Sequence, residues 1–215
     1  MAYRKTPAEL RRLDAAREHL IARATAVVAE VGWSQASVTA VADSAGIAAG
    51  SVYQHFPSKS ALAVEVFRRA AGHEVAVLEE VLRGPGDAVS RLASGVGVFA
   101  RRALENRGLA YALLAAPAEP AVGAERLDHR RRYRALFAEV VREGIATGQL
   151  PPQHAEITAA ALTGAVGEVL AYPLGAPDDT ATGTTGSTGS TDDLLAELTA
   201  TVLRCAGAAA HPTTA

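Results

Sequence analysis

Apolar side chains along this chain recur at intervals of three and four residues, which is the spacing of one face of an α-helix. The first series predicts a helix over residues 9–31 that ends at Gly32, because glycine readily adopts the backbone conformation found at helix ends. Ser37 is a suitable N-cap for a short second helix that Gly46 ends, and a third short helix is expected over residues 48–56. The apolar positions of this region are Leu13, Ala16, Leu20, Ala24, Val27, Val28, Val31, Val38, Val41, Ala42, Ala45, Ile47, Val52 and Phe56.

The same periodicity continues through the rest of the chain, and no alternating pattern typical of a β-strand is sustained. Residues 173–191 are rich in Gly, Thr, Ser, Asp and Pro, a composition that predicts a mobile loop. The prediction is an all-α fold of about nine helices, with an N-terminal helix-turn-helix domain over residues 1–58 and a second helical domain over residues 59–215. The later helices are expected over residues 59–83, 87–106, 109–115, 122–147, 154–171 and 192–206.

The composition suits a globular protein, with 49% hydrophobic and 20% charged residues among 215. The single cysteine, Cys205, cannot form an internal disulfide, which indicates a reducing compartment. Residues 1–12 are polar and charged and lack the apolar segment of a signal peptide. No run of about 18 apolar residues is present, so no membrane span is expected and the protein is expected to be cytoplasmic.

Charge is distributed unevenly between the two predicted domains. Residues 1–73 carry nine basic and six acidic side chains, whereas the rest of the chain carries twelve basic and seventeen acidic side chains. A basic N-terminal part joined to an acidic body favours contact between the first part and a polyanion such as DNA.

Residues 37–56 form two short predicted helices around a glycine turn, which is the helix-turn-helix arrangement. The major groove admits one α-helix, so the second helix must present polar side chains outward while its apolar side chains hold it to the domain. Val52 and Phe56 suit the inner face, and Gly50 permits close approach of the backbone. The outward side chains are Ser51, Tyr53, Gln54 and His55.

These residues, over roughly positions 15–65, resemble the signature of the tetracycline-repressor (TetR) family. The resemblance implies an all-helical homodimer whose N-terminal domain binds DNA and whose C-terminal domain binds a small molecule, an effector of unknown identity. It further implies a repressor that its ligand releases from the operator. The matching motifs are Gly32-Trp33, Ser37-Val38-Thr39, Ala45-Gly46-Ile47 and Gly50-Ser51-Val52-Tyr53-Gln54-His55-Phe56-Pro57-Ser58-Lys59.

Two alanines depart from the family pattern, because Ala48 and Ala49 stand where a polar residue and then a polar or basic residue are usual. The DNA contacts are therefore expected to shift toward Ser51, Tyr53, His55 and the basic N-terminal segment with Arg4, Lys5, Arg11 and Arg12, which is read as a disordered arm. Alternatives stay open: Tyr53 could pack under its helix, and His55, Thr39 and Lys59 could be ordinary solvent-facing residues. The full expected DNA-binding set is Ser37, Thr39, Gly50, Ser51, Tyr53, Gln54, His55 and Lys59.

Other chemistries find little support in the sequence. The glycines of residues 95–100 imitate a dinucleotide-binding fingerprint, but they lie in a helical pattern with no preceding strand. The six histidines and Cys205 show no metal-ligand spacing, and neither a nucleophile elbow nor a phosphate-binding loop occurs. We expect no cofactor, no metal and no enzymatic activity. An enzyme and a helical protein-interaction module are the rival classes.

A homodimer is expected to form through the last two long helices, and its two-fold axis predicts a palindromic operator on double-stranded DNA, with half-sites about one helical turn apart or slightly more. Small residues at i+3 and i+4 spacing would let two helix backbones approach closely. The alternative is that this stripe is buried within one subunit. The expected interface residues are Ala160, Gly164, Gly167 and Ala171, with Leu194, Leu195, Leu198 and Val202 of the final helix.

A ligand pocket is expected between two helices of the C-terminal domain. Phe99 belongs to the apolar face of one, and Arg130, Arg134 and Phe137 share a face of the other. A guanidinium on an otherwise apolar face needs a partner, which could be an acidic side chain, a ligand carboxylate or solvent reached by the arginine's long stem. The expected lining is Phe99, Tyr111, Leu114, Arg130, Arg134 and Phe137, and the helix over residues 59–83 would link this pocket to the DNA-binding domain.

Overall fold

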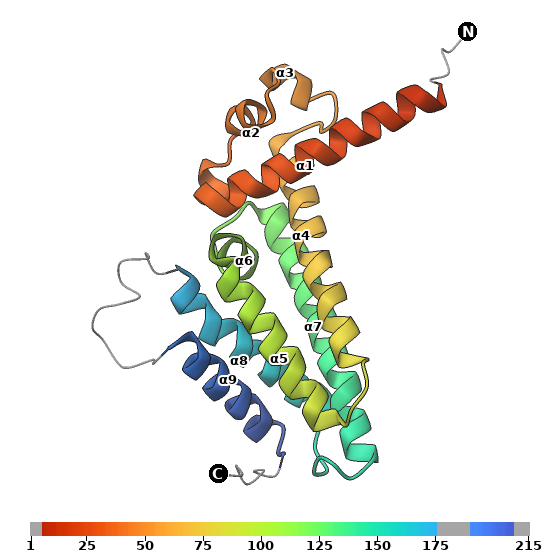
Figure 1. The fold of residues 1–215 in the computed structure, drawn as a ribbon, viewed down its shortest axis with the longest axis vertical. Helices are drawn as coiled ribbons and strands as arrows, with labels where there is room; N and C mark the ends of the chain where they lie inside the picture. The colour runs from red at the N-terminus through yellow and green to blue at the C-terminus, as the bar shows by residue number, and fades with distance from the viewer. Residues whose placement is uncertain (1–5, 176–189, 209–215) are drawn as a thin grey trace.

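The computed structural model describes residues 6–175 and 190–208, and these residues form nine helices and no strand. This confirms the predicted all-α fold (Figure 1). Most of the predicted loop over residues 173–191 lies outside the described residues, although residues 173–175 continue a helix. The helices are α1 (Pro7–Gln35), α2 (Val38–Ala45), α3 (Ala49–Val52), α4 (Lys59–Leu82), α5 (Ala88–Glu105), α6 (Arg107–Leu114), α7 (Pro120–Ala146), α8 (Ala155–Gly175) and α9 (Thr191–Cys205).

Side-chain caps and glycines set the helix ends near the DNA-binding region. Ser37 and Ser58 cap α2 and α4 as predicted, and Gly46 ends α2 in the left-handed conformation with φ 68°. Gly32, at φ 71°, interrupts α1 where its end was predicted, but one more helical turn carries the helix on to Gln35. Thr6 and Glu9 form a capping box at its start, so the expected disordered arm is wrong from Pro7 onward, where the chain is helical.

The third helix is shorter than predicted. Only Ala49–Val52 are helical, and Tyr53, Gln54 and His55 lie in a turn. Ala48 has no side-chain oxygen with which to cap the helix, and Pro57 disfavours a helical conformation in the residue before it. Both ends of this segment therefore lack the features that would extend a helix.

Two apolar cores run along the molecule. The first joins α1, α2 and α3 to the first half of α4, to α6 and to the start of α7, through residues that include Val52, Phe67 and Ala112. The second fills the space between the second half of α4 and helices α5, α7, α8 and α9. Figure 1 shows α4 running from the helix-turn-helix end into the body beside α7. Because the first core extends past residue 58, α4 and α6 connect the two regions mechanically.

Helix α8 is long and apolar enough to cross a membrane by length and composition, with a mean hydropathy of 1.4 over its most apolar window. Thr163 and Glu168 interrupt its apolar residues, so α8 is not the uninterrupted apolar run that the sequence was expected to lack. One face of α8, including Leu162, Val166 and Leu170, is buried in the second core. A core helix of a globular protein meets the same criterion, so the finding is weak evidence for a membrane span.

Candidate DNA-binding surface and ligand pocket

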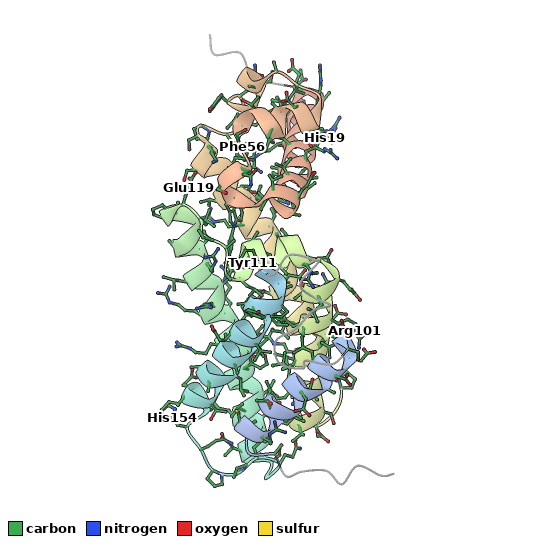
Figure 2. The ribbon with its side chains drawn as sticks, turned by 90° about the vertical axis from the view of Figure 1, so that its left-hand side faces the viewer. His19, Phe56, Arg101, Tyr111, Glu119 and His154 are labelled. Carbon is green, nitrogen blue, oxygen red and sulfur yellow. The ribbon has the colours of Figure 1, made fainter. Side chains whose placement is uncertain are left out.

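The helix-turn-helix is held together by buried apolar side chains. Val41, Val52 and Phe56 are almost fully buried, and Figure 2 shows Phe56 among the N-terminal helices. The Ser37 hydroxyl accepts a hydrogen bond from the Ala40 amide at 3.0 Å, which fixes the start of α2. These contacts orient the segment after α2 outward, as a groove-reading element requires.

The predicted DNA-binding residues lie on the outside of this unit. Tyr53 is 53% exposed, and Thr39, Gly50 and Gln54 are exposed, whereas Ser51 and His55 are half-buried. The Tyr53 side chain therefore does not pack under its helix. A Cβ atom on Gly50 would meet nothing within 4 Å, so packing within the subunit does not require glycine there.

Lys59 is engaged within the chain, because its Nζ lies 3.8 Å from Oε1 of Glu119 at the start of α7. This pair links the first turn of α4 to the C-terminal region, and it partly neutralises the lysine. Arg11 and Arg12 are exposed on the first turns of α1, while Arg4 and Lys5 lie outside the described residues.

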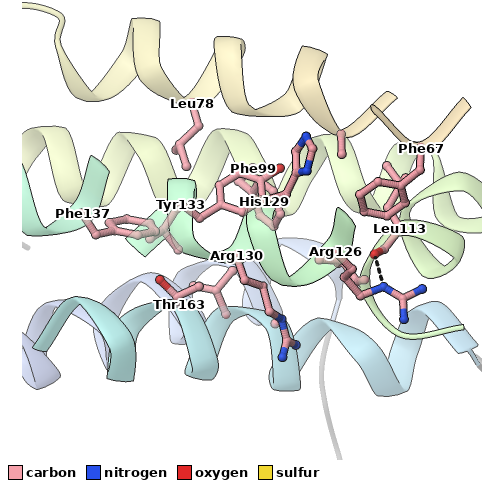
Figure 3. A pocket seen from close by; sticks show the side chains of 15 residues that line it. Phe67, Leu78, Phe99, Leu113, Arg126, His129, Arg130, Tyr133, Phe137 and Thr163 are labelled. Carbon is pink, nitrogen blue, oxygen red and sulfur yellow. Dashed lines mark hydrogen bonds between the residues drawn. The ribbon is translucent and has the colours of Figure 1, made fainter. Parts of the chain in front are cut away.

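A cavity of about 50 Å³ lies between α4, α5, α6, α7 and α8 (Figure 3). Four of the predicted ligand-binding residues line it: Phe99, Leu114, Arg130 and Phe137. Phe99 meets Tyr133 edge to face with ring centroids 5.4 Å apart, and burial raises the pKa of the Tyr133 hydroxyl. The other lining residues are Phe67, Ala71, Leu78, Val96, Leu113, Arg126, His129, Tyr133, Thr163, Val166 and Gly167.

Two predicted lining residues lie elsewhere. Arg134 is exposed, and Tyr111 packs against the backbone of Gly175 at the end of α8. The inward series on α7 is Arg126, His129, Tyr133 and Phe137, which also has i+3 and i+4 spacing, whereas Arg130 lines the cavity from an exposed position. The sequence pattern fits this series and the expected face equally well, because the two are offset by about one residue.

Arg126 connects the cavity to the DNA-binding region. Its guanidinium donates hydrogen bonds to the carbonyls of Leu113, Ala112 and Ala116 at the C-terminal end of α6, at 2.8 to 3.0 Å. The indole nitrogen of Trp33, at the end of α1, donates to the same Ala112 oxygen at 2.8 Å. Burial, and to a lesser degree Arg130, lower the pKa of Arg126. Sequence reasoning did not find this contact, because backbone carbonyls are not readable as partners.

The close packing of α6 against α1 adds a second connection. A Cβ atom on Gly108 would lie only 1.9 Å from the Ala29 carbonyl oxygen, so only glycine fits at this position without displacing a backbone. Movement of α6 would therefore be transmitted to α1.

The residues predicted for the dimer interface are divided between surface and core. Ala160 and Gly164 are exposed on α8, and Gly167 and Ala171 are half-buried. Leu195, Leu198 and Val202 are buried in the subunit's own second core, because α9 packs its apolar face on α5 and α8. These three side chains are therefore removed from the proposed interface, and Leu194 is half-buried.

Comparison with known families agrees with both regions. Residues 20–66 match the sequence model of the bacterial regulatory proteins of the tetR family, and residues 85–171 match a tetracyclin repressor-like C-terminal domain. Together the two matches span more than half of the chain. The chain belongs to the TetR family. It is therefore a DNA-binding transcriptional regulator, and the residues of α2 and α3 are the part of this TetR-family protein that corresponds to the DNA-binding unit.

Several known transcriptional regulators are similar to it. The transcriptional repressor KstR2 of Mycolicibacterium smegmatis is 26% identical over 140 residues, which are 63% of this chain and 68% of that protein. The fatty acid metabolism regulator protein of Bacillus subtilis is 31% identical over 74 residues, 34% of this chain and 38% of that protein. The solved structure of FadR from Bacillus subtilis in complex with stearoyl-CoA superimposes with a TM-score of 0.71 at 20% identity, covering 90% of this chain and 99% of that one. At that identity the structural likeness supports the shared fold.

Proposed function

We propose that the protein is a dimeric repressor that leaves its operator when a ligand with an apolar chain enters the cavity between α4 and α8. The observation that carries this proposal is the carbonyl of Ala112, which accepts hydrogen bonds both from the cavity-lining Arg126 and from Trp33 of the DNA-binding region. The protein acts by binding and without catalysis.

DNA recognition is proposed to rest on Thr39, Gly50, Ser51, Tyr53 and Gln54, with His55 at the edge and Ser37 holding α2 in place. The exposure of Thr39, Gly50, Tyr53 and Gln54, beside a buried framework, supports this assignment. Lys59, Arg11 and Arg12 would supply phosphate contacts that position the domain without reading sequence.

The outer face of α8 is proposed as the dimer interface. Ile157 and Tyr172 are 66% and 81% exposed, and Ala161 and Gly164 lie between them on the same face. An exposed apolar face of this kind is typical of a subunit contact. A two-fold axis there would present two helix-turn-helix units to a palindromic operator.

An apolar chain is the ligand that suits the cavity, because its walls are mainly aromatic and aliphatic side chains. The names of two relatives point the same way, since one regulates fatty acid metabolism and FadR was solved with stearoyl-CoA. A volume of about 50 Å³ holds only a few water molecules, so a chain could enter only if helices around it moved.

That movement supplies the proposed switch. Phe67 and Leu78 of α4 and Arg126 of α7 line the same cavity, so a ligand that separates these helices would shift α4 and the end of α6. Both elements contact α1, which packs on α2 of the helix-turn-helix, and a ligand favours the released state only if it binds that state better.

The experiment begins with selection of bound fragments from genomic DNA by the purified protein, followed by footprinting. A palindromic site is expected. Release from that site is then measured by fluorescence anisotropy with saturated fatty acids and acyl-CoA thioesters of several chain lengths. No sequence preference, or no release by any apolar-chain ligand, would count against the proposal.

A further inference from the structure

His129 is the only buried histidine among the described residues, and it lies in the wall of the ligand cavity. Its side chain is 4% exposed, and its ring meets that of Phe67 edge to face, with the centroids 5.3 Å apart. Figure 3 shows it among the aromatic and aliphatic side chains of the cavity. A polar group in such surroundings lowers stability unless its polar atoms find partners, so the partners of both ring nitrogens matter.

One ring nitrogen has its partner within the chain. Nδ1 of His129 lies 2.9 Å from the carbonyl oxygen of Glu125, one helical turn earlier. A carbonyl oxygen only accepts, so Nδ1 carries the proton, and Nε2 of the neutral ring is an acceptor. Arg126 and Arg130 line the cavity and no carboxylate does, which disfavours a further positive charge on the ring. The Glu125 carboxylate itself is paired with Arg68 at 2.6 Å.

The Tyr133 hydroxyl is the second polar group. Tyr133 follows His129 by one turn of α7, the spacing at which side chains on a helix are neighbours, and both residues line the cavity. Among the described residues the hydroxyl makes no hydrogen bond, and burial raises its pKa, so it remains protonated. Neither this oxygen nor Nε2 of His129 is enclosed by packed protein, because in the described part of the chain the only fully enclosed side-chain atoms without a hydrogen-bond partner belong to Arg91.

The other polar side chains of the wall are already satisfied or reach solvent. The Thr163 hydroxyl donates to the Ala159 carbonyl at 2.8 Å, and Arg126 donates to three carbonyls of α6. Arg130 is exposed. A ligand in this cavity therefore meets two polar atoms with free hydrogen-bonding capacity, and a plain hydrocarbon chain that covered them would leave both without a partner.

We propose that the effector carries a hydroxyl group in its apolar part, held between Nε2 of His129 and the hydroxyl of Tyr133. The inference rests on the proposed function and adds the polar group of its ligand. A hydroxyl satisfies both residues at once, because it donates its proton to Nε2 and accepts one from the tyrosine. An ether or carboxylate oxygen only accepts, so it leaves Nε2 unpaired. His129 and Tyr133 thereby determine specificity, since they reject a chain that lacks the hydroxyl.

The test measures binding to the full-length protein by isothermal titration calorimetry. The probes are dodecanoate, a series of dodecanoates with one hydroxyl at successive carbon atoms, and the methyl ether of each. At least one hydroxylated chain is expected to bind about fivefold or more tightly than dodecanoate, and its ether should lose that gain. An apolar site without polar partners gives the opposite order, because a hydroxyl prefers water.

Tyr133→Phe removes a single oxygen atom and should reduce the preference for the hydroxylated over the plain chain about threefold or more. Tyr111→Phe is the matched control, because Tyr111 does not line the cavity, and it should keep the preference. Nitrogen NMR of the histidine side chains gives a readout independent of affinity. The proton is expected on Nδ1 of His129, and the Nε2 resonance should shift on binding of the hydroxylated chain and not of its ether.

Equal affinity of plain and hydroxylated chains at every position, or a preference that survives Tyr133→Phe, would overturn the inference and leave water as the partner of both atoms. A charged His129 ring in the NMR spectrum would overturn it as well. Failure of the proposed function looks different. Chains that bind without releasing the operator contradict the repressor mechanism, and the absence of binding by every chain contradicts both proposals, whereas equal binding and release by plain and hydroxylated chains refutes only the hydroxyl.

Discussion

Trp33 and Arg126 donate hydrogen bonds to one backbone oxygen, that of Ala112, from opposite sides of the junction between the DNA-binding region and the ligand cavity. Trp33 lies in the last turn of α1, and Arg126 lies in the second turn of α7 and lines the cavity. If either donor moves, the Ala112 carbonyl must move with it or lose one of its two hydrogen bonds.

Trp33→Phe tests this junction, since it removes the N–H and keeps an aromatic ring beside Phe67, whose centroid lies 6.4 Å away. The free energy of unfolding should fall by about 0.5–1.5 kcal/mol in urea denaturation, because one hydrogen bond is lost. Ligand affinity should change less than about twofold, while the ligand-induced loss of operator affinity should shrink about fivefold or more. Tyr111→Phe is the control on α6, and an equal effect of both changes would argue against a role of the Ala112 carbonyl.

Tyr53→Ala and His55→Ala should each weaken binding to the selected operator by about 1–3 kcal/mol if these side chains make specific contacts. Measurement by anisotropy against operator and scrambled duplex separates specific from general losses. If neither variant changes the preference for operator over scrambled DNA, these residues do not belong to the recognition surface.

Lys59 should behave differently, because its charge positions the domain and does not read bases. Lys59→Ala is expected to weaken binding to all duplexes alike and to lower the slope of log affinity against log salt by about one. Glu119→Gln frees Lys59 from its carboxylate partner, so it should raise DNA affinity and steepen that slope. A decrease in affinity on removal of Glu119 would show that the ion pair orients Lys59 for its contact.

Gly108→Ala should destabilise the protein, because its Cβ atom would lie 1.9 Å from the Ala29 carbonyl oxygen. A loss of at least about 1–3 kcal/mol in the free energy of unfolding is expected from such overpacking. Gly97→Ala is the matched control in α5, where a Cβ atom meets nothing within 4 Å, and it should stabilise by about 0.5–1 kcal/mol through helix propensity. Destabilisation by both changes would mean that the tight α1–α6 contact is not the cause.

The double variant Ile157→Glu, Tyr172→Glu should yield monomers in analytical ultracentrifugation, since it places two charges on the outer face of α8. Operator affinity should then fall at least about tenfold because one subunit engages a single half-site. Leu10→Glu, at an exposed leucine on α1, is the control and should remain dimeric. Dimers that survive the α8 changes would place the interface elsewhere.

The sequence predicted the parts of this fold that depend on local backbone chemistry. Ser37, Gly46 and Ser58 sit at the helix ends expected of them, because a cap or a left-handed turn is decided within a few residues. The family signature then gave the function of the N-terminal region without any tertiary information.

Partners between distant segments were less predictable. Periodicity shows that α9 has an apolar face, but it does not say that α5 and α8 of the same subunit cover Leu195, Leu198 and Val202. On α7, Leu127 and Arg134 follow the same spacing as Arg126 and Tyr133 and are offset by one residue, so the pattern alone could not choose the inward series. The Ala112 carbonyl carries no sequence signal at all.

The smallness of the cavity sets how sensitive this regulator can be. A ligand that must first force the helices apart binds with an apparent affinity reduced by the rarity of the open form. Under the proposed mechanism, trace amounts of effector would leave the regulated genes repressed, and only its accumulation would release the operator. Substitutions at Phe99 or Tyr133 that loosen the closed packing would move that threshold without altering any contact with DNA.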